Sequence, residues 1–159
     1  MKNITTEIKW ALIFVAMTLS WMVFEKLAGF HDVNIEKHPV VTNLIAIPAI
    51  AIYVLALLDK RKRDYAGVMS YKQGFISGLI ITAIVTLLSP LTQVITSLLI
   101  TPDYFKNVIE YTVSQGLKSR EEAEKYFSLG SYIAQGLIGA PIMGIITTAI
   151  VALFTRTKS

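Results

Sequence analysis

The sequence contains no cysteine and only two histidines. Without cysteine, a disulfide scaffold, a thiolate metal site and a cysteine nucleophile are all excluded. Charge is also scarce, because charged residues make up 16% of the chain whereas soluble domains contain about 25%. The H-E-x-x-H, G-x-S-x-G and Walker motifs are absent as well. We therefore expect no enzymatic activity and no cofactor.

The scarcity of charge leaves four uncharged blocks, at residues 10–24, 39–58, 73–102 and 126–155. A membrane-spanning helix needs about 17–25 predominantly apolar residues. The last three blocks reach this length alone, and the first reaches it if Lys9 and Lys26 snorkel. We expect an all-α, integral membrane four-helix bundle in a single domain, residues 1–159. Its spans are predicted at about 6–27, 39–58, 74–100 and 131–155.

The distribution of charge predicts the orientation of the bundle. If the basic run 60–63 is cytoplasmic, four spans place both termini on the cytoplasmic side. The inner segments then hold nine basic and three acidic residues, and the outer segments hold six and eight. The excess of basic residues in the inner segments follows the positive-inside rule. The high pI of about 9.3 therefore reflects membrane sidedness, and we expect no nucleic-acid partner.

The same basic run, Lys60, Arg61, Lys62 and Arg63, has two interpretations. Each basic residue near anionic lipid headgroups contributes about 1 kcal/mol of binding, which makes membrane lipids the expected partners. The simpler interpretation is a topology anchor without lipid specificity. We favour the anchor, because nearly any inner loop carries such residues.

A short polar segment, residues 29–38, holds both histidines, His31 and His38, together with Asp32 and Glu36. Imidazoles and carboxylates are ligands of zinc and copper. The spacing fits no known metal-ligand pattern, however. We therefore expect a solvated loop without a metal, with His31 and His38 as weak metal-ligand candidates.

Polar side chains inside the spans are few. The second, third and fourth spans contain no Asp, Glu, His, Lys or Arg, and Gln93 and Gln135 are their strongest polar groups. This argues against proton relays and charged-substrate sites. Glu25 lies some 20 residues after the start of the first span, about one hydrocarbon thickness away. We expect it at the outer interface, whereas a buried Glu25 would mark a functional site.

The third and fourth spans each carry small residues at every fourth position. Those predicted to pack helices together are Gly74, Gly78, Gly136, Ala140 and Gly144. Small residues let helix backbones approach closely in lipid. The spacing is compatible with packing within one chain or between copies in a homo-oligomer. Three prolines near mid-span, at positions 48, 90 and 141, predict kinks that shape the bundle.

The outer segment, residues 102–130, predicts a helical hairpin. Thr101 and Pro102 resemble a helix N-cap and first helical position, and the residues that follow alternate with amphipathic helical spacing. Gly116 is placed to stop this helix. Ser119 and Glu122 have capping-box spacing and start a second one. The apolar face of the hairpin is compatible with three roles: lying on lipid, covering the bundle or binding a partner.

The segment Met69-Ser70-Tyr71-Lys72-Gln73-Gly74-Phe75 opens the third span, and Pro102-Asp103 starts the polar outer segment. These features, and the layout of nearly the whole chain, resemble a family of small four-span membrane proteins catalogued as a domain of unknown function, number forty-one ninety-nine. The resemblance implies a bacterial protein of the cytoplasmic (inner) membrane. It implies no activity, cofactor or catalytic residue.

Two classes of function remain. The first is a non-enzymatic accessory or structural membrane protein, self-associating or bound to a larger complex, with the outer hairpin as its interaction surface. The alternative is a small permease for a neutral or apolar solute. A continuous polar cavity that reaches Gln93 or Gln135 favours the permease, and a closed apolar bundle favours the accessory role.

Overall fold

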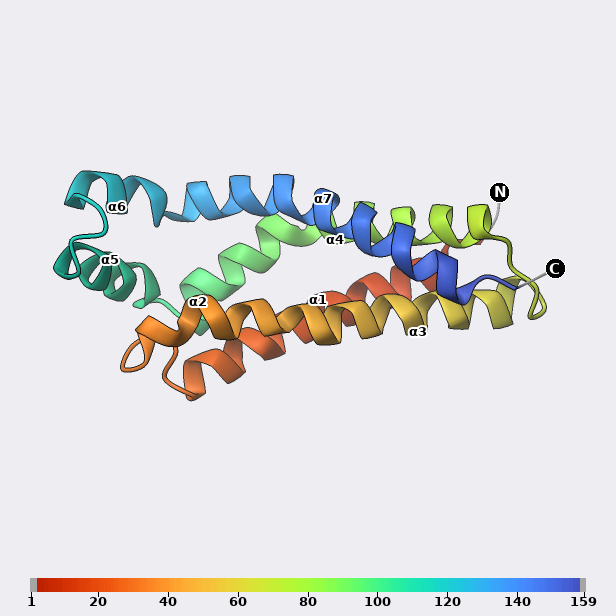
Figure 1. Ribbon diagram of the computed structural model, residues 1–159, viewed down its shortest axis with the longest axis horizontal. Coiled ribbons are helices and arrows are strands. Elements are labelled where there is room, and N and C mark those ends of the chain that lie inside the picture. Colours follow the sequence, from red (N-terminus) through yellow and green to blue (C-terminus); the bar gives the residue numbers. More distant parts are fainter. Residues whose placement is uncertain (1–2, 158–159) are drawn as a thin grey trace.

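Four long helical stretches run side by side along the molecule (Figure 1) in a computed structural model that describes residues 3–157. Within these residues every regular element is helical, and a hairpin separates the third stretch from the fourth. The predicted all-α bundle with its hairpin is therefore confirmed. The stretches are α1 (Thr5–Leu27); η1 (Ile35–Lys37), α2 (His38–Val41), η2 (Thr42–Ile45) and α3 (Ala46–Asp64); α4 (Tyr71–Ile95) with η3 (Thr96–Ile100); and α7 (Leu129–Thr155). The hairpin consists of α5 (Tyr104–Ser114) and α6 (Arg120–Tyr126).

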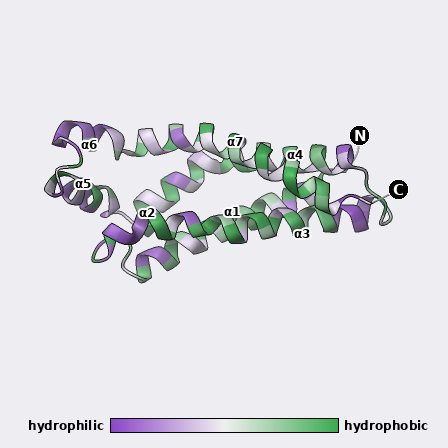
Figure 2. Cartoon of the chain, viewed as in Figure 1, coloured by the Kyte–Doolittle hydropathy of each residue, from purple (hydrophilic) through white to green (hydrophobic). Residues whose placement is uncertain are grey.

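Each of the four stretches is long and apolar enough to cross a membrane, at 23, 30, 30 and 27 residues. Large apolar side chains project outward from them, among them Leu87, Leu99 and Phe154, each at least 75% exposed. Apolar residues dominate the middle of the bundle and polar residues gather at its two ends (Figure 2). This is the surface of a multi-pass membrane protein. The second stretch, predicted at 39–58, is longer than expected because the helix continues through the basic run to Asp64.

The described N- and C-terminal ends of the chain lie at one end of the bundle, and the hairpin lies at the other (Figure 1). An even number of spans produces this arrangement. Which end faces the cytoplasm stays a prediction from the charge distribution.

The closest helix packing joins α4 to α7 through the small residues. Gly78 faces Thr148, and Gly144 faces Thr82 in the reciprocal position. A Cβ atom at Gly78 would lie 2.6 Å from the Thr148 Oγ1, so no larger residue fits without movement. The two ridges of small residues therefore meet within one chain. Next to this contact the Tyr53 hydroxyl lies 2.8 Å from the Thr82 Oγ1, which joins α3 to α4.

The three predicted prolines occupy different helix positions, two inside long helices and one near a helix start. Pro90 lies inside α4 and has no N–H to donate to the carbonyl of Thr86. The Ser89 hydroxyl donates to that carbonyl instead, at 2.8 Å. Pro48 lies in the first turn of α3, directly after the 3₁₀ turn η2. Pro141 lies inside α7.

The hairpin covers one end of its own bundle. The apolar face of α5 buries Tyr104 and Val108 against Ile35 of η1. Ser119 and Glu122 form the predicted capping box at the start of α6. The predicted cap of α5 is wrong, because that helix begins at Tyr104 and the Thr101 hydroxyl donates backward to the carbonyl of Thr96. Of the three roles open to the apolar face, the structure shows packing on the bundle.

A buried ion cluster ties three helices together at the opposite end. The ammonium of Lys60 lies 2.9 Å from the carboxylates of both Glu7 and Asp64. Ser77 donates to the second oxygen of Glu7 at 2.8 Å. Lys60 and Glu7 are only 3% and 2% exposed. The interpretation of Lys60 as a lipid-headgroup residue is therefore wrong, because its side chain is buried with these carboxylates.

The other members of the basic run lie nearer the surface. Arg61 donates to the carbonyl of Thr155 at 2.9 Å, which fastens α3 to the end of α7. Lys62 is exposed, and Arg63 pairs on the surface with Asp59. Of the four basic residues, Lys62 and Arg63 are therefore the two whose side chains are exposed and can reach anionic lipid.

Candidate functional site

A tight turn after α1 brings Glu25, near the end of that helix, next to the histidines of the polar segment that follows. The helix ends at Leu27, and Gly29 adopts a φ of +78°, in the left-handed region that favours glycine. The amide of Phe30 then donates back to the carbonyl of Glu25 at 2.9 Å. This reversal folds the following residues over the end of α1, so that His31 lies above Glu25.

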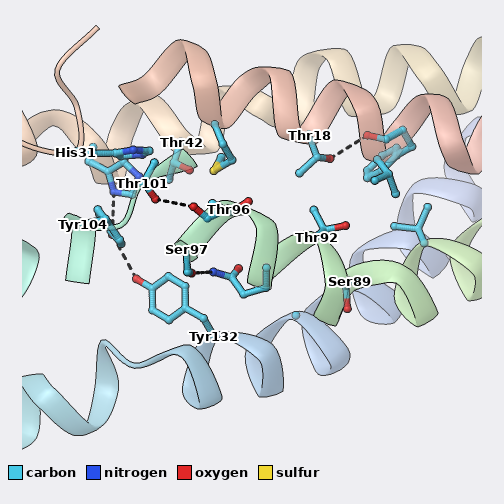
Figure 3. Close-up of a pocket in the computed structure, with 18 residues that line it drawn as sticks. Thr18, His31, Thr42, Ser89, Thr92, Thr96, Ser97, Thr101, Tyr104 and Tyr132 are labelled. Carbon is cyan, nitrogen blue, oxygen red and sulfur yellow. Dashed lines mark hydrogen bonds between the residues drawn. The ribbon is translucent and has the colours of Figure 1, made fainter. Parts of the chain in front are cut away.

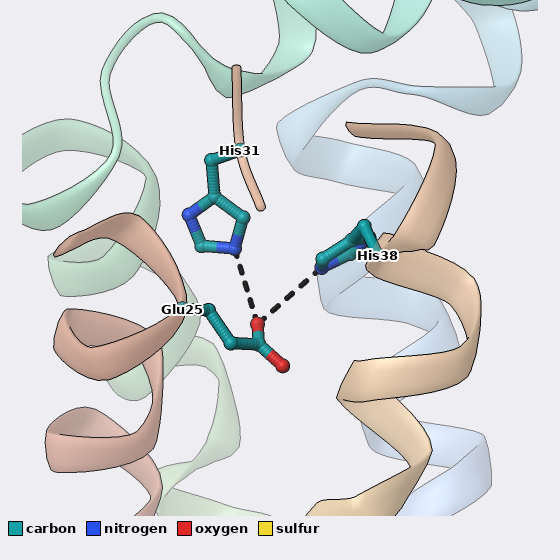
Figure 4. A group of neighbouring side chains, drawn as sticks. All are labelled: Glu25, His31 and His38. Atoms are coloured by element: carbon teal, nitrogen blue, oxygen red, sulfur yellow. Dashed lines mark hydrogen bonds and ion pairs between the residues drawn. The ribbon is translucent and has the colours of Figure 1, made fainter. Parts of the chain in front are cut away.

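Glu25, His31 and His38 form one cluster (Figure 4). The Nε2 atom of His31 lies 3.1 Å from the Glu25 Oε2, and the Nε2 atom of His38 lies 3.3 Å from the same oxygen. Glu25 has no exposed surface and His31 is 5% exposed. The three donor atoms all lie within 4.8 Å of one another. Such a group can hold a cation or share a proton.

Trp21 and Tyr104 hold this cluster in place. The indole N–H of Trp21, one turn earlier in α1, donates to the other Glu25 oxygen, Oε1, at 2.6 Å. The Tyr104 hydroxyl lies 3.3 Å from the Nδ1 atom of His38, and its ring packs against both imidazoles at 5.0 and 5.1 Å between centroids. Burial raises the pKa of the Tyr104 hydroxyl above its ordinary value, so this hydroxyl stays protonated.

Two expectations about these residues are wrong. Glu25 is enclosed by protein and does not reach headgroup water, because the turn at Gly29 and helix α5 cover it. The histidines do not belong to a solvated loop: His31 is buried and His38 is half-buried. Asn107 of α5 donates to the carbonyl of His31 at 3.0 Å and fixes this covering.

A cavity of about 330 Å³ extends from this cluster into the bundle (Figure 3). Its walls come from α1, η2, α4, η3 and α7, and Tyr104 and Tyr132 lie at its hairpin end. Its apolar lining consists of Phe14, Val15, Met22, Val85, Gly136 and Ala140. Its polar lining consists of His31, His38, Thr18, Thr42, Ser89, Thr92, Gln93, Thr96, Ser97, Thr101, Tyr104 and Tyr132.

Several hydroxyl groups that line the cavity already form hydrogen bonds within the protein. Thr18 donates to the carbonyl of Phe14, and Thr92 to the carbonyl of Leu88. The amide of Gln93 donates to the Ser97 hydroxyl at 2.8 Å. Among the described residues, no Asp, Glu, Lys or Arg lines the cavity directly. The walls are thus weakly polar and carry no formal charge beyond what the histidines hold.

The other residues singled out in the sequence fall into separate places. Gln93 faces the cavity, whereas Gln135 is exposed and donates to the Ser131 hydroxyl. Gly136 and Ala140 line the cavity, where their small size leaves it open. The remaining glycines, Gly74, Gly78 and Gly144, lie at the helix contact outside it.

Trp21 and Tyr104 were missed as members of the site. For Trp21 a signal existed, because residues four apart lie on the same helix face and Trp21 precedes Glu25 by that spacing. Tyr104 belongs to the predicted apolar face of the hairpin. Nothing in the sequence indicates that this face meets the histidines.

The comparisons with known proteins agree with the fold and add no activity. No curated protein and no solved structure matches the chain. A family model matches residues 9–157, nearly the whole chain, and confirms the resemblance noted in the sequence. The chain belongs to the family described as protein of unknown function, DUF4199.

Proposed function

We propose that this membrane protein binds a small, uncharged, weakly polar solute in the cavity and passes it across the membrane without chemical conversion. The observation that carries the proposal is the cavity itself, which reaches Gln93 at the level of Pro90 and η3. The surface of this cavity is mostly apolar, with Gln93 and several hydroxyls among its lining. A cavity that reaches this glutamine favours a permease over a closed accessory bundle.

The lining supports the class of solute. A charged molecule would lose its hydration without meeting a fixed opposite charge on the walls, which is costly inside a membrane. Apolar side chains such as Phe14 and Met22 favour a solute with some hydrocarbon surface, and Ser97 and Thr92 offer oxygen atoms. A volume of about 330 Å³ lies at the lower end for ligand pockets, which span about 300–1,000 Å³.

Transport through the cavity would require a second state of the bundle, because the cavity does not continue to the other end. Beyond the cavity, toward the chain termini, the bundle is closed by the Gly78–Thr148 contact and the Tyr53–Thr82 hydrogen bond. Passage requires this contact between α4 and α7 to open. Pro90 in α4 and the π-helical turn η3 that follows it are the places where this stretch departs from regular α-helical hydrogen bonding, and such places are where helices bend.

The accessory role has less support. That proposal needs the hairpin as an interaction surface for a partner, and the apolar face of α5 is already used within the chain by Tyr104 and Val108. What α5 and α6 leave exposed is mostly polar, as the pair of Arg120 with Glu124 illustrates.

Solute entry into proteoliposomes tests the proposal. Vesicles with and without the protein are shifted into 1,2-propanediol, 1,2,4-butanetriol or glycerol, and their re-swelling is followed by light scattering. We expect faster re-swelling with the protein for at least one of these polyols, and no acceleration for choline chloride.

Two variants on α7 control the test. Ala140→Phe fills the cavity and should reduce the protein-dependent rate at least tenfold. Ile146→Phe places the same ring at a position 49% exposed on the outer surface and should leave the rate unchanged. Equal rates in protein-containing and protein-free vesicles for all three polyols would refute the proposal.

A further inference from the structure

We propose that Glu25, His31 and His38 form a binding site for a divalent transition-metal ion, with Zn²⁺ as the ion that best fits the donor set. One carboxylate oxygen and two imidazole nitrogens are ligands that zinc accepts. The inference concerns the end of the cavity beneath the hairpin and does not depend on whether a solute passes.

Two of the three distances between the donor atoms match the spacing of metal ligands, and all three are within 4.8 Å. In a tetrahedral site with bonds of about 2.0–2.1 Å, neighbouring ligand atoms lie roughly 3.3–3.4 Å apart. The Glu25 Oε2 lies 3.1 Å from the Nε2 of His31 and 3.3 Å from the Nε2 of His38. Both imidazoles turn Nε2 toward the same oxygen (Figure 4). Binding therefore needs the imidazoles and the carboxylate to turn so that both Nε2 atoms and Oε2 face one ion.

The charge balance also calls for a cation. The structure contains two almost fully buried glutamates, Glu7 and Glu25. Glu7 is paired with the ammonium of Lys60, whereas within residues 3–157 Glu25 pairs with no Lys or Arg. Its partners are the two imidazoles and the uncharged indole N–H of Trp21. A buried carboxylate without a fixed positive partner is costly. A bound divalent ion supplies the missing positive charge.

Hydrogen-bond partners orient two of the three ligands, Glu25 and His38, whereas the Nδ1 of His31 has no such partner within residues 3–157. Trp21 occupies the Glu25 Oε1 by donating at 2.6 Å, which leaves Oε2 directed at the histidines. The Tyr104 hydroxyl lies 3.3 Å from the Nδ1 of His38, within reach of the N–H that an Nε2-ligated imidazole carries there. Such contacts fix the ring orientation of metal-ligating histidines.

Three protein ligands leave a fourth coordination position. Both histidines and Tyr104 line the cavity, so this position faces the cavity rather than the protein interior. Sites with three protein ligands and an open position bind water or an oxygen-bearing ligand there. A polar solute in the cavity would therefore meet the metal at its hairpin end.

Zinc binding to the purified, untagged full-length protein tests the site. The protein in detergent is stripped with EDTA, dialysed against ZnCl₂ and analysed for bound metal, and CoCl₂ serves as a second probe whose visible spectrum reports tetrahedral coordination. We expect one Zn²⁺ per chain, and at least a tenfold loss of affinity in Glu25→Gln and His38→Asn. Glu7→Gln and Glu36→Gln, which alter the other buried glutamate and an exposed neighbour, should bind as the unaltered chain does.

X-ray absorption of the zinc-loaded protein keeps the test decisive if a ligand variant fails to fold. The site predicts a first shell of nitrogen and oxygen at about 2.0–2.1 Å with outer-shell scattering from two imidazoles. Absence of stoichiometric zinc in the unaltered chain would overturn the proposal and leave the cluster as a carboxylate paired with histidines. Equal affinity in folded Glu25→Gln and His38→Asn variants, or a shell without imidazole, would overturn it as well.

Discussion

Replacing Lys60 by methionine is expected to destabilise the bundle strongly, because it removes the ammonium that pairs with both acids of the buried ion cluster. Lys60 contacts Glu7 and Asp64 at 2.9 Å each and donates to the carbonyl of Asn3 at 2.8 Å. Methionine keeps an unbranched side chain of similar length. The loss of stability therefore measures the effect of removing the charge more than the effect of changed packing.

The expected magnitude follows from the environment of the two acids. Removing one partner of a buried ion pair costs about 3–5 kcal/mol. Asp64 keeps 27% of its side chain exposed and can be hydrated again. Glu7 is 2% exposed and, within residues 3–157, retains as its one side-chain partner the hydroxyl of Ser77. We expect a loss near the lower limit, about 3 kcal/mol, carried mainly by Glu7.

Unfolding in mixed micelles measures this loss. Sodium dodecyl sulfate is titrated into the protein in dodecyl maltoside, and tryptophan fluorescence follows unfolding, with Trp10 near the cluster through its hydrogen bond to Asp59. Adding Glu7→Gln to the Lys60→Met variant removes the unpaired charge and should recover about 1–2 kcal/mol. Lys62→Met, on the exposed side of the same helix, should change stability by less than about 0.5 kcal/mol. If Lys60→Met matches Lys62→Met, or the second substitution adds a full further loss, the account of the cluster is wrong.

Two further predictions concern helix packing and orientation. Gly78→Ala should lower the free energy of unfolding by about 1–3 kcal/mol, because its Cβ meets Thr148. Gly139→Ala should be neutral or slightly stabilising, because beyond the neighbouring backbone of its own helix nothing lies within 4 Å of its Cβ. Equal effects of the two substitutions in the same assay would contradict the contact. In intact cells, an impermeant maleimide should label Ser114→Cys and spare Ser70→Cys, because the charge distribution puts the hairpin outside; preferential labelling of position 70 reverses the orientation.

The helices of this protein can be predicted from its sequence, because membrane insertion depends on composition over long windows. Uncharged blocks of sufficient length set the spans, and local hydrogen bonding at Ser119 and Glu122 sets the start of α6. The small-residue ridges also indicate which surfaces pack closely. Their pairing, Gly78 with Thr148, required the structure, because spacing alone does not identify the opposite helix.

The candidate site is less predictable because its contacts are not local. Glu25 meets His31 only through the chain reversal at Gly29. His38 meets Tyr104 across 66 residues of sequence. A carboxylate at a helix end and two histidines in a short polar segment are typical of a solvated surface, and burial by α5 changes their chemistry. The same reasoning explains why Lys60, whose partner Glu7 is 53 residues away, resembled a surface residue.

Access of a small uncharged reagent to the cavity tests the account most directly. The chain has no cysteine, so Thr92→Cys introduces a single thiol into the cavity lining. Leu91→Cys places one at the neighbouring position, which is 58% exposed on the outer surface. In proteoliposomes, methyl methanethiosulfonate should modify position 92 at least tenfold faster than position 91, and Ala140→Phe should abolish that difference. Equal rates at the two positions, or a rate at position 92 that Ala140→Phe leaves unchanged, would contradict an accessible solute cavity.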